Sequence, residues 1–153
     1  MAADGVGNEP YGKPAPITSG PFAGWTSWGL GADPFETHVG PFCIKHEDGR
    51  VRCAFEPRPE HLNGGGAIHG GALMSFADFA LFAFAYKALA SGAKTVTLTC
   101  NCEFLSPGTL DGWVEAEGEV LRESRSLVFV RGLITQQSRP VLAFSGTLKK
   151  IAG

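Results

Sequence analysis

The chain has 153 residues, a length that fits one domain of ordinary size. Hydrophobic residues make up 44% and charged residues 18%, with mean hydropathy +0.04, a composition typical of a globular protein that can bury further surface in an oligomer. The formal net charge of −2, the pI of about 6.1 and the lack of a basic run argue against nucleic acid as a partner.

Residues 1–20 are rich in Gly, Pro and small polar residues, which predicts a flexible tail ahead of a single domain over residues 21–153. The tail has no apolar stretch like that of a signal peptide, so we expect a cytoplasmic protein. The longest apolar region is interrupted by Asp78, which argues against a membrane span. An irregular segment packed on the core is predicted after the tail by four aromatic residues: Phe22, Trp25, Trp28 and Phe35.

Two extended runs come next, "PFCIKHE" and "VRCAFEP", and Asp48-Gly49 between them predicts a hairpin turn. A helix pattern runs from Gly70 to about Ala90, with apolar residues on nearly all sides, as in a helix enclosed by other elements. Alternating residues then predict four strands, with a turn from Gln136 to Pro140 before the last. We therefore expect an α+β fold in which a curved antiparallel sheet wraps around one long central helix.

Four cysteines are present, and none of them forms a CxxC pair. Cys100 and Cys102 are two residues apart in a strand pattern, so their side chains share a face. With Cys43 and Cys53, they are expected to be buried free thiols in a reducing compartment. No His or Cys partners stand at ligand spacing, so we predict no metal site.

The start of the helix pattern, "HLNGGGAIHGG", is rich in glycine. A GxGxxG motif beginning at Gly64 would need glycine at position 69, where the chain has His69, and neither a P-loop lysine nor a GxSxG motif is present. The first N–H groups of a helix have no partners inside it, and Gly70 and Gly71 leave them open to a substrate carbonyl oxygen. Alternatively, the glycines only permit a tight turn and close packing.

Asp78 stands in the middle of this apolar helix, with Met74, Ser75, Leu81 and Phe82 three and four residues away. An unpaired buried carboxylate is costly, so Asp78 needs either a partner, such as Ser75, or a function. It lies eight residues beyond Gly70, roughly 12 Å along the helix axis. One carbonyl cannot contact both in one helix. If both act on one substrate, two antiparallel helices of a two-fold dimer must form a composite site.

The run "HLNGGGAIHGGALMSFAD" resembles the H-x-N-x-x-G-x-x-H-G-G-x(6)-D signature of hotdog-fold thioesterases of the PaaI-like branch. "TVTLTCNCEFLSPG", "VLRESRSLVFVRGLI" and "VLAFSGTLKK" resemble the later strands of that family, so the resemblance covers about residues 35–150. It implies dimers joined by a continuous sheet, often paired into tetramers. In those relatives the acid comes from a different chain than the Asn, His and Gly, which agrees with the spacing argument.

The resemblance also implies a role for each residue of the signature. Gly70 would polarise the thioester carbonyl through its N–H, and Asp78 would act as general base or nucleophile. Asn63 would position the substrate or the water, His69 would lie near the carbonyl and the leaving thiol, and Thr97 would orient the attacking water. His61 is expected to brace the loop.

The function expected from this resemblance is hydrolysis of an aryl- or medium-chain acyl-CoA, with no cofactor. Gly71 is expected to bind the substrate, and Met74, Phe79 and Phe82 are expected to line an apolar acyl pocket. The CoA phosphates need cations, and the candidates are Arg122, Arg125 and Arg139. Two other functions of the same fold remain open: a non-catalytic acyl-CoA-binding protein and an enoyl-CoA hydratase.

Overall fold

The structure is a computed structural model, and it describes residues 14–28 and 33–151. Its strands are β1 (Pro14–Pro16), β2 (Thr26–Trp28), β3 (Cys43–Glu47), β4 (Arg50–Phe55), β5 (Thr95–Phe104), β6 (Val114–Glu123), β7 (Leu127–Gln136) and β8 (Arg139–Lys150). Its helices are α1 (Pro34–Val39), the 3-10 helix η1 (Pro59–His61), α2 (Gly70–Phe84) and α3 (Tyr86–Leu89).

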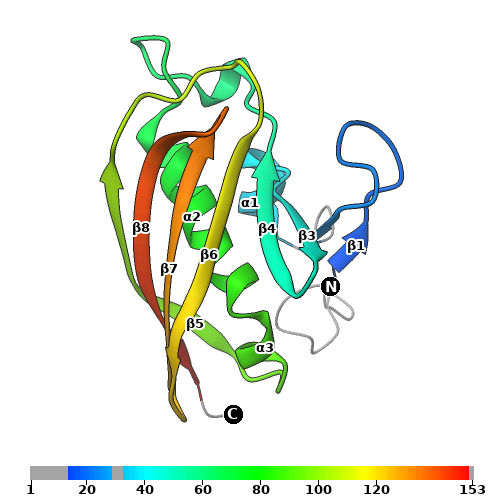
Figure 1. Ribbon diagram of the computed structural model, residues 1–153, viewed down its shortest axis with the longest axis vertical. Coiled ribbons are helices and arrows are strands. Elements are labelled where there is room, and N and C mark those ends of the chain that lie inside the picture. Colours follow the sequence, from blue (N-terminus) through cyan, green and yellow to red (C-terminus); the bar gives the residue numbers. More distant parts are fainter. Residues whose placement is uncertain (1–13, 29–32, 152–153) are drawn as a thin grey trace, which may run out of the picture.

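The strands form one antiparallel sheet in the order β1-β2-β3-β4-β6-β7-β8-β5. Helix α2 contacts β4, β6, β7, β8 and β5, and Figure 1 shows it lying against the face of this curved sheet. The predicted fold, a curved antiparallel sheet around one central helix, is therefore confirmed. Strand β5 pairs only with β8, so within the described residues its other edge has no neighbour.

The sheet approaches α2 closely because glycines replace side chains at points of contact. A Cβ on Gly146 would lie 2.3 Å from the Leu81 side chain, and one on Gly118 would lie 2.4 Å from the Phe84 ring. Leu81 and Phe84 are buried on this side of the helix, together with Phe76 and Ala80. The two glycines thus allow the sheet to wrap around a helix that carries large apolar side chains.

The helix is not enclosed on all sides, and it is shorter than predicted. Met74 is 42% exposed, and Gly71 and the half-buried Asp78 lie on the same side of α2. The predicted helix to Ala90 was wrong at its end, because α2 ends at Phe84 and α3 begins after Ala85. Among the residues described, no helix combines the length and apolar character needed to cross a bilayer.

The N-terminal segment differs in part from the prediction. Residues 1–13 of the predicted tail lie outside the described residues, whereas Pro14–Pro16 form β1 and pair with β2. Phe22 and Trp25 are buried with Cys43 and Ala54 in a small cluster, which Trp113 partly covers. Cys43 and Ala54 alternate with the helix-facing residues of β3 and β4, so this cluster covers the other face of the sheet. Phe35, predicted to pack on the core, lies in α1 and is exposed.

The β7–β8 turn is also shorter than predicted. It consists of Gln137 and Ser138, both with positive φ, and Pro140 belongs to β8. Gln136 is a buried residue of β7 rather than a turn residue. Its side-chain amide accepts from the Thr109 N–H (2.9 Å) and donates to the Thr109 and Gly112 carbonyls (2.8 and 3.0 Å). Gln136 therefore holds the long loop between β5 and β6.

Candidate active site

The glycine-rich loop before α2 is held by Asn63, one of the predicted site residues. The Asn63 side-chain oxygen accepts from the Gly65 N–H (2.8 Å) and the Ala67 N–H (3.2 Å). Because the oxygen is used in this way, the Nδ2 group remains as a donor, and it has no partner within the described part of the chain. Asn63 is exposed, so this donor is open to a ligand.

His61 has the bracing role that was expected. Its ring accepts from the Arg58 N–H at Nδ1 (2.9 Å) and donates from Nε2 to the Val39 carbonyl (2.8 Å), and its own carbonyl accepts from the His69 N–H (2.7 Å). The imidazole is buried and both of its nitrogens are engaged. His61 therefore connects the α1 region to the start of α2.

The first N–H groups of α2 are not equivalent. His69 is the N-cap, and its Nδ1 accepts from the Gly71 N–H at 2.8 Å, which leaves the ring proton on Nε2. Gly71 therefore does not offer an open N–H, contrary to the expectation from the sequence. Gly70 does, because its N–H has no hydrogen-bond partner among residues 14–28 and 33–151. The helix start thus presents one backbone donor at the positive end of its dipole.

Phe104, the last residue of β5, flanks this donor and was not among the predicted site residues. A Cβ on Gly70 would lie 3.1 and 3.2 Å from atoms of the Phe104 ring, which is 55% exposed. An apolar surface therefore adjoins the free N–H of Gly70. The signal in the sequence was an aromatic residue at the end of a strand pattern, just before Ser106-Pro107-Gly108.

Asp78 lies on the side of α2 that faces β5. The Thr97 hydroxyl donates to Asp78 Oδ1 at 2.7 Å, so the structure brings these two predicted residues together. Ser75, the partner considered as an alternative, instead donates to the Gly71 carbonyl at 2.8 Å. The carboxylate is half-buried and has a polar contact that fixes its orientation.

Two thiols lie beside this carboxylate. Cys100 and Cys102 are half-buried, rather than fully buried as expected, and their sulfur atoms are 3.9 Å apart. Burial, followed by the neighbouring Cys102 and the charge of Asp78, raises the pKa of Cys100 to about 12. Burial and the charge of Asp78 also raise the pKa of Cys102. Both groups are therefore protonated near neutral pH and are poor nucleophiles. The residues with described positions contain no group of three side chains suited to a metal ion.

The residues predicted to bind substrate are not gathered in one place. Met74 is exposed and Phe82 half-buried on α2, whereas Phe79 is 7% exposed and packs on Trp28 and Phe42 in the core. The position of Phe79 favours a packing role over contact with an acyl group.

The three predicted cations also lie apart. Arg122 and Arg125 are exposed near the β6–β7 turn, at the end of the sheet opposite to Gly70. Arg139 lies at the Gly70 end and donates to Ser106 Oγ (2.6 Å) and the Pro107 carbonyl (2.8 Å), so it braces the loop after β5.

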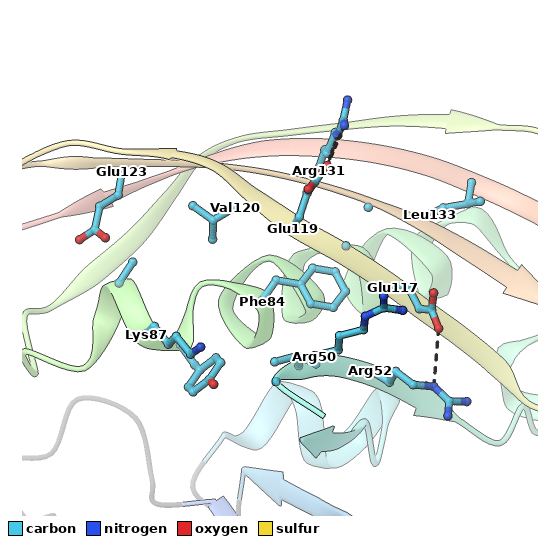
Figure 2. A pocket seen from close by; sticks show the side chains of 16 residues that line it. Arg50, Arg52, Phe84, Lys87, Glu117, Glu119, Val120, Glu123, Arg131 and Leu133 are labelled. Carbon is cyan, nitrogen blue, oxygen red and sulfur yellow. Dashed lines mark hydrogen bonds and ion pairs between the residues drawn. The ribbon is translucent and has the colours of Figure 1, made fainter. Parts of the chain in front are cut away.

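An open groove of about 810 Å³ lies on a different side of α2 from Asp78. It forms where β4 and β6 diverge beyond Arg52, and Figure 2 shows Phe84, Lys87 and Val120 along it. Its charged residues include ion pairs, such as Arg52 with Glu117 (3.7 Å) and Arg131 with Glu119 (2.7 Å). None of the predicted site residues lines this groove, so it is separate from the site at Gly70 and Asp78.

Comparison with known proteins gives consistent matches. The model of the thioesterase superfamily (4HBT) matches residues 65–143. The acyl-coenzyme A thioesterase PaaI of Escherichia coli (strain K12) is 33% identical over 116 residues, which cover 75% of this chain and 81% of that protein.

Two solved structures extend this similarity to the fold. That of the E. coli PaaI protein from the phenylacetic acid degradation operon superposes with a TM-score of 0.67 and 27% identity, covering 79% of this chain and 86% of the other. A hypothetical thioesterase from Streptococcus pneumoniae, solved with coenzyme A, superposes with a TM-score of 0.62 and 26% identity, covering 72% and 86%.

Proposed function

Because the chain belongs to the thioesterase superfamily, in its PaaI-like hotdog branch, and is a thioester hydrolase that acts on acyl-CoA, we propose that Asp78 and the Gly70 N–H are its catalytic groups. The reaction converts acyl-CoA and water to a carboxylic acid and free CoA. The observation that carries the assignment is the bond from Thr97 to Asp78, which holds a half-buried carboxylate on the open side of α2.

In this proposal the thioester oxygen binds at the free N–H of Gly70. Negative charge develops on that oxygen when the carbonyl carbon is attacked, and the N–H together with the helix dipole stabilises it. Asp78 either removes a proton from the attacking water or attacks the carbonyl itself, in which case water then hydrolyses the anhydride. In both routes the CoA thiolate leaves and takes up a proton. Thr97 orients the carboxylate, and Asn63 offers its Nδ2 donor to substrate or water.

Each site is proposed to combine Gly70 of one chain with Asp78 of a partner, because the two are roughly 12 Å apart along one helix. Three features support a homodimer formed through β5 and the open side of α2. The free edge of β5 can pair with a second β5, apolar residues such as Phe104 and Leu105 are exposed there, and Met74 is exposed on the helix. A dimer of such dimers is part of the same proposal.

The substrate is proposed to carry an aryl or medium-chain acyl group. The exposed Phe104 ring beside Gly70, with Met74 and Phe82 on α2, supports an apolar acyl group at this site. The coenzyme A in the S. pneumoniae relative supports a CoA-bound substrate. Arg122 and Arg125 remain predicted contacts for the CoA phosphates, on the partner subunit if the site is composite.

The test is thiol release from a panel of aryl- and straight-chain acyl-CoAs, by the wild type and by Asp78→Asn. We expect turnover of at least one substrate, and a loss of about 10²–10⁴-fold in kcat for the variant. Asp111→Asn is the matched control, since it removes an exposed carboxylate elsewhere. Crotonyl-CoA separates hydrolysis from hydration, because hydration leaves the thioester intact. Activity of Asp78→Asn within a few-fold of wild type would reject Asp78 as catalytic.

A further inference from the structure

Strand β5 contains a bulge next to the proposed catalytic carboxylate. Thr97 pairs with Leu148 and Thr99 with Thr147 of β8, so Leu98 is an extra residue between two neighbouring rungs. A bulge of this kind changes which side chains face each side of a sheet. In β5 it lies directly beside Thr97, whose hydroxyl contacts Asp78.

The bulge opposes the hydrophobic pattern of its own strand. From Val96 to Cys102 the residues alternate between apolar and polar, and a regular strand would place all the apolar ones on one face. In the structure Cys100 and Cys102 are half-buried on the helix side, but Val96 and Leu98 are 42% and 52% exposed. Thr97 takes the helix-facing position instead. The bulge therefore leaves the apolar side chains of Val96 and Leu98 exposed and places the Thr97 hydroxyl against Asp78.

Thr99 stabilises the bulge through its side chain. The Thr147 N–H donates to Thr99 Oγ1 at 3.1 Å, where a regular ladder would supply a backbone carbonyl. Without that hydroxyl the Thr147 N–H loses this acceptor at the interrupted rung. The regular pairing, which turns Thr97 away from α2, then gains in relative stability. Local departures from pattern of this kind are expected at functional sites.

We propose that Thr99 is a positioning residue for thioester hydrolysis: it holds the Leu98 bulge and, through it, keeps Thr97 on Asp78. The proposal rests on the proposed function of Asp78. Thr99 itself is exposed and touches neither the carboxylate nor the Gly70 N–H. Its effect should therefore be on the geometry of the attacking group and not on substrate binding.

The experiment compares Thr99→Val, which removes the acceptor, with Thr99→Ser, which keeps it. Thr99→Val should lower kcat about 10- to 100-fold, the scale for a misplaced catalytic group. KM should stay within about threefold, because no substrate contact is removed. Thr99→Ser should retain most of the wild-type kcat. Ser145→Ala is the control, since it removes an exposed hydroxyl of β8 at a regular position of the sheet, opposite Asn101 of β5.

A double-mutant cycle with Thr97→Val tests whether Thr99 acts through Thr97. If it does, the double variant should lose little more than either single one; additive losses would overturn the proposal. A normal kcat in Thr99→Val beside a low kcat in Thr97→Val would overturn it and leave the proposed function intact. A normal kcat in Asp78→Asn would instead reject the function itself. If Thr99→Val does not fold, Thr99→Ala replaces it in the cycle.

Discussion

Replacing Gly70 by proline removes the proposed oxyanion donor with little disturbance of the helix. Proline is tolerated at the first position of a helix, where the N–H has no helical partner. The preceding His69 already has φ −60° and ψ 136°, the extended conformation that a residue before proline prefers. The added Cβ meets only the exposed Phe104 ring, which can move by a few tenths of an ångström. Gly70→Ala is the matched control, since it adds the same Cβ and keeps the N–H.

Gly70→Pro should lower kcat about 10²–10³-fold, as for the loss of one oxyanion donor, whereas Gly70→Ala should lose much less. Asp78→Ala should be impaired for a different reason, the loss of its carboxylate. Mixing Gly70→Pro with Asp78→Ala then tests the composite site. With random exchange half of the dimers are mixed, and one of their two sites is intact, so activity should return to about a quarter of the wild-type value.

The assay is thiol release before and after reassembly of the two variants, with exchange followed by native mass spectrometry and folding by circular dichroism. A mixture of Gly70→Ala with Asp78→Ala is the reference, because every chain in it keeps the N–H donor at position 70. If exchange is complete and activity does not rise above that of the separate variants, one chain supplies the whole site, and the reasoning from helix spacing is refuted.

Three further outcomes are expected. Asn63→Asp keeps the oxygen that accepts from the loop N–H groups and removes the Nδ2 donors, so the melting temperature should not change. The variant should lose less kcat/KM than Asp78→Asn, because positioning is only part of the chemistry. If Asn63→Asp lost more, the roles of the two residues would be reversed. Gln136→Leu removes the bonds to Thr109 and Gly112 and should lower the free energy of unfolding by about 1–3 kcal/mol in urea titrations. At pH 8, the raised pKa of Cys100, about 12 against an ordinary 9.0, should make its thiolate about 10³-fold scarcer and its reaction with a disulfide reagent correspondingly slow. Rapid labelling of Cys100 would contradict its placement.

Elements with a local signal were predictable from the sequence. Asp48 and Gly49 both have positive φ in the β3–β4 turn, the conformation that an Asp-Gly pair favours. The start of α2 at Gly70 follows from the loop before it. The end of α2 at Phe84 could not be predicted in this way. Position 85 is alanine and not a glycine, proline or polar residue, and the apolar pattern continues beyond it. Strands β1 and β2 are only three residues long, too short for an alternation to be visible.

The candidate site was predictable in its residue types but not in its contacts. The spacing pointed to Gly70 and Asp78, and the family resemblance to Asn63 and Thr97. That His69 takes the Gly71 N–H and leaves Gly70 free depends on the cap geometry, which no spacing encodes. The contact of Thr97 with Asp78 depends on the bulge, which runs against the alternation of β5. Long-range contacts of this kind are set by tertiary structure.

The small aromatic cluster on the outer face of the sheet has a spectroscopic consequence. Of the three tryptophans in the chain, Trp25 and Trp113 meet in that cluster, and only Trp28 packs against α2, on Phe79. Intrinsic fluorescence will therefore report chiefly on the docking of the N-terminal segment, whereas far-ultraviolet circular dichroism reports on the sheet as a whole. If the segment detaches before the sheet melts, the fluorescence transition will come first, and the gap between the two curves will measure that local opening.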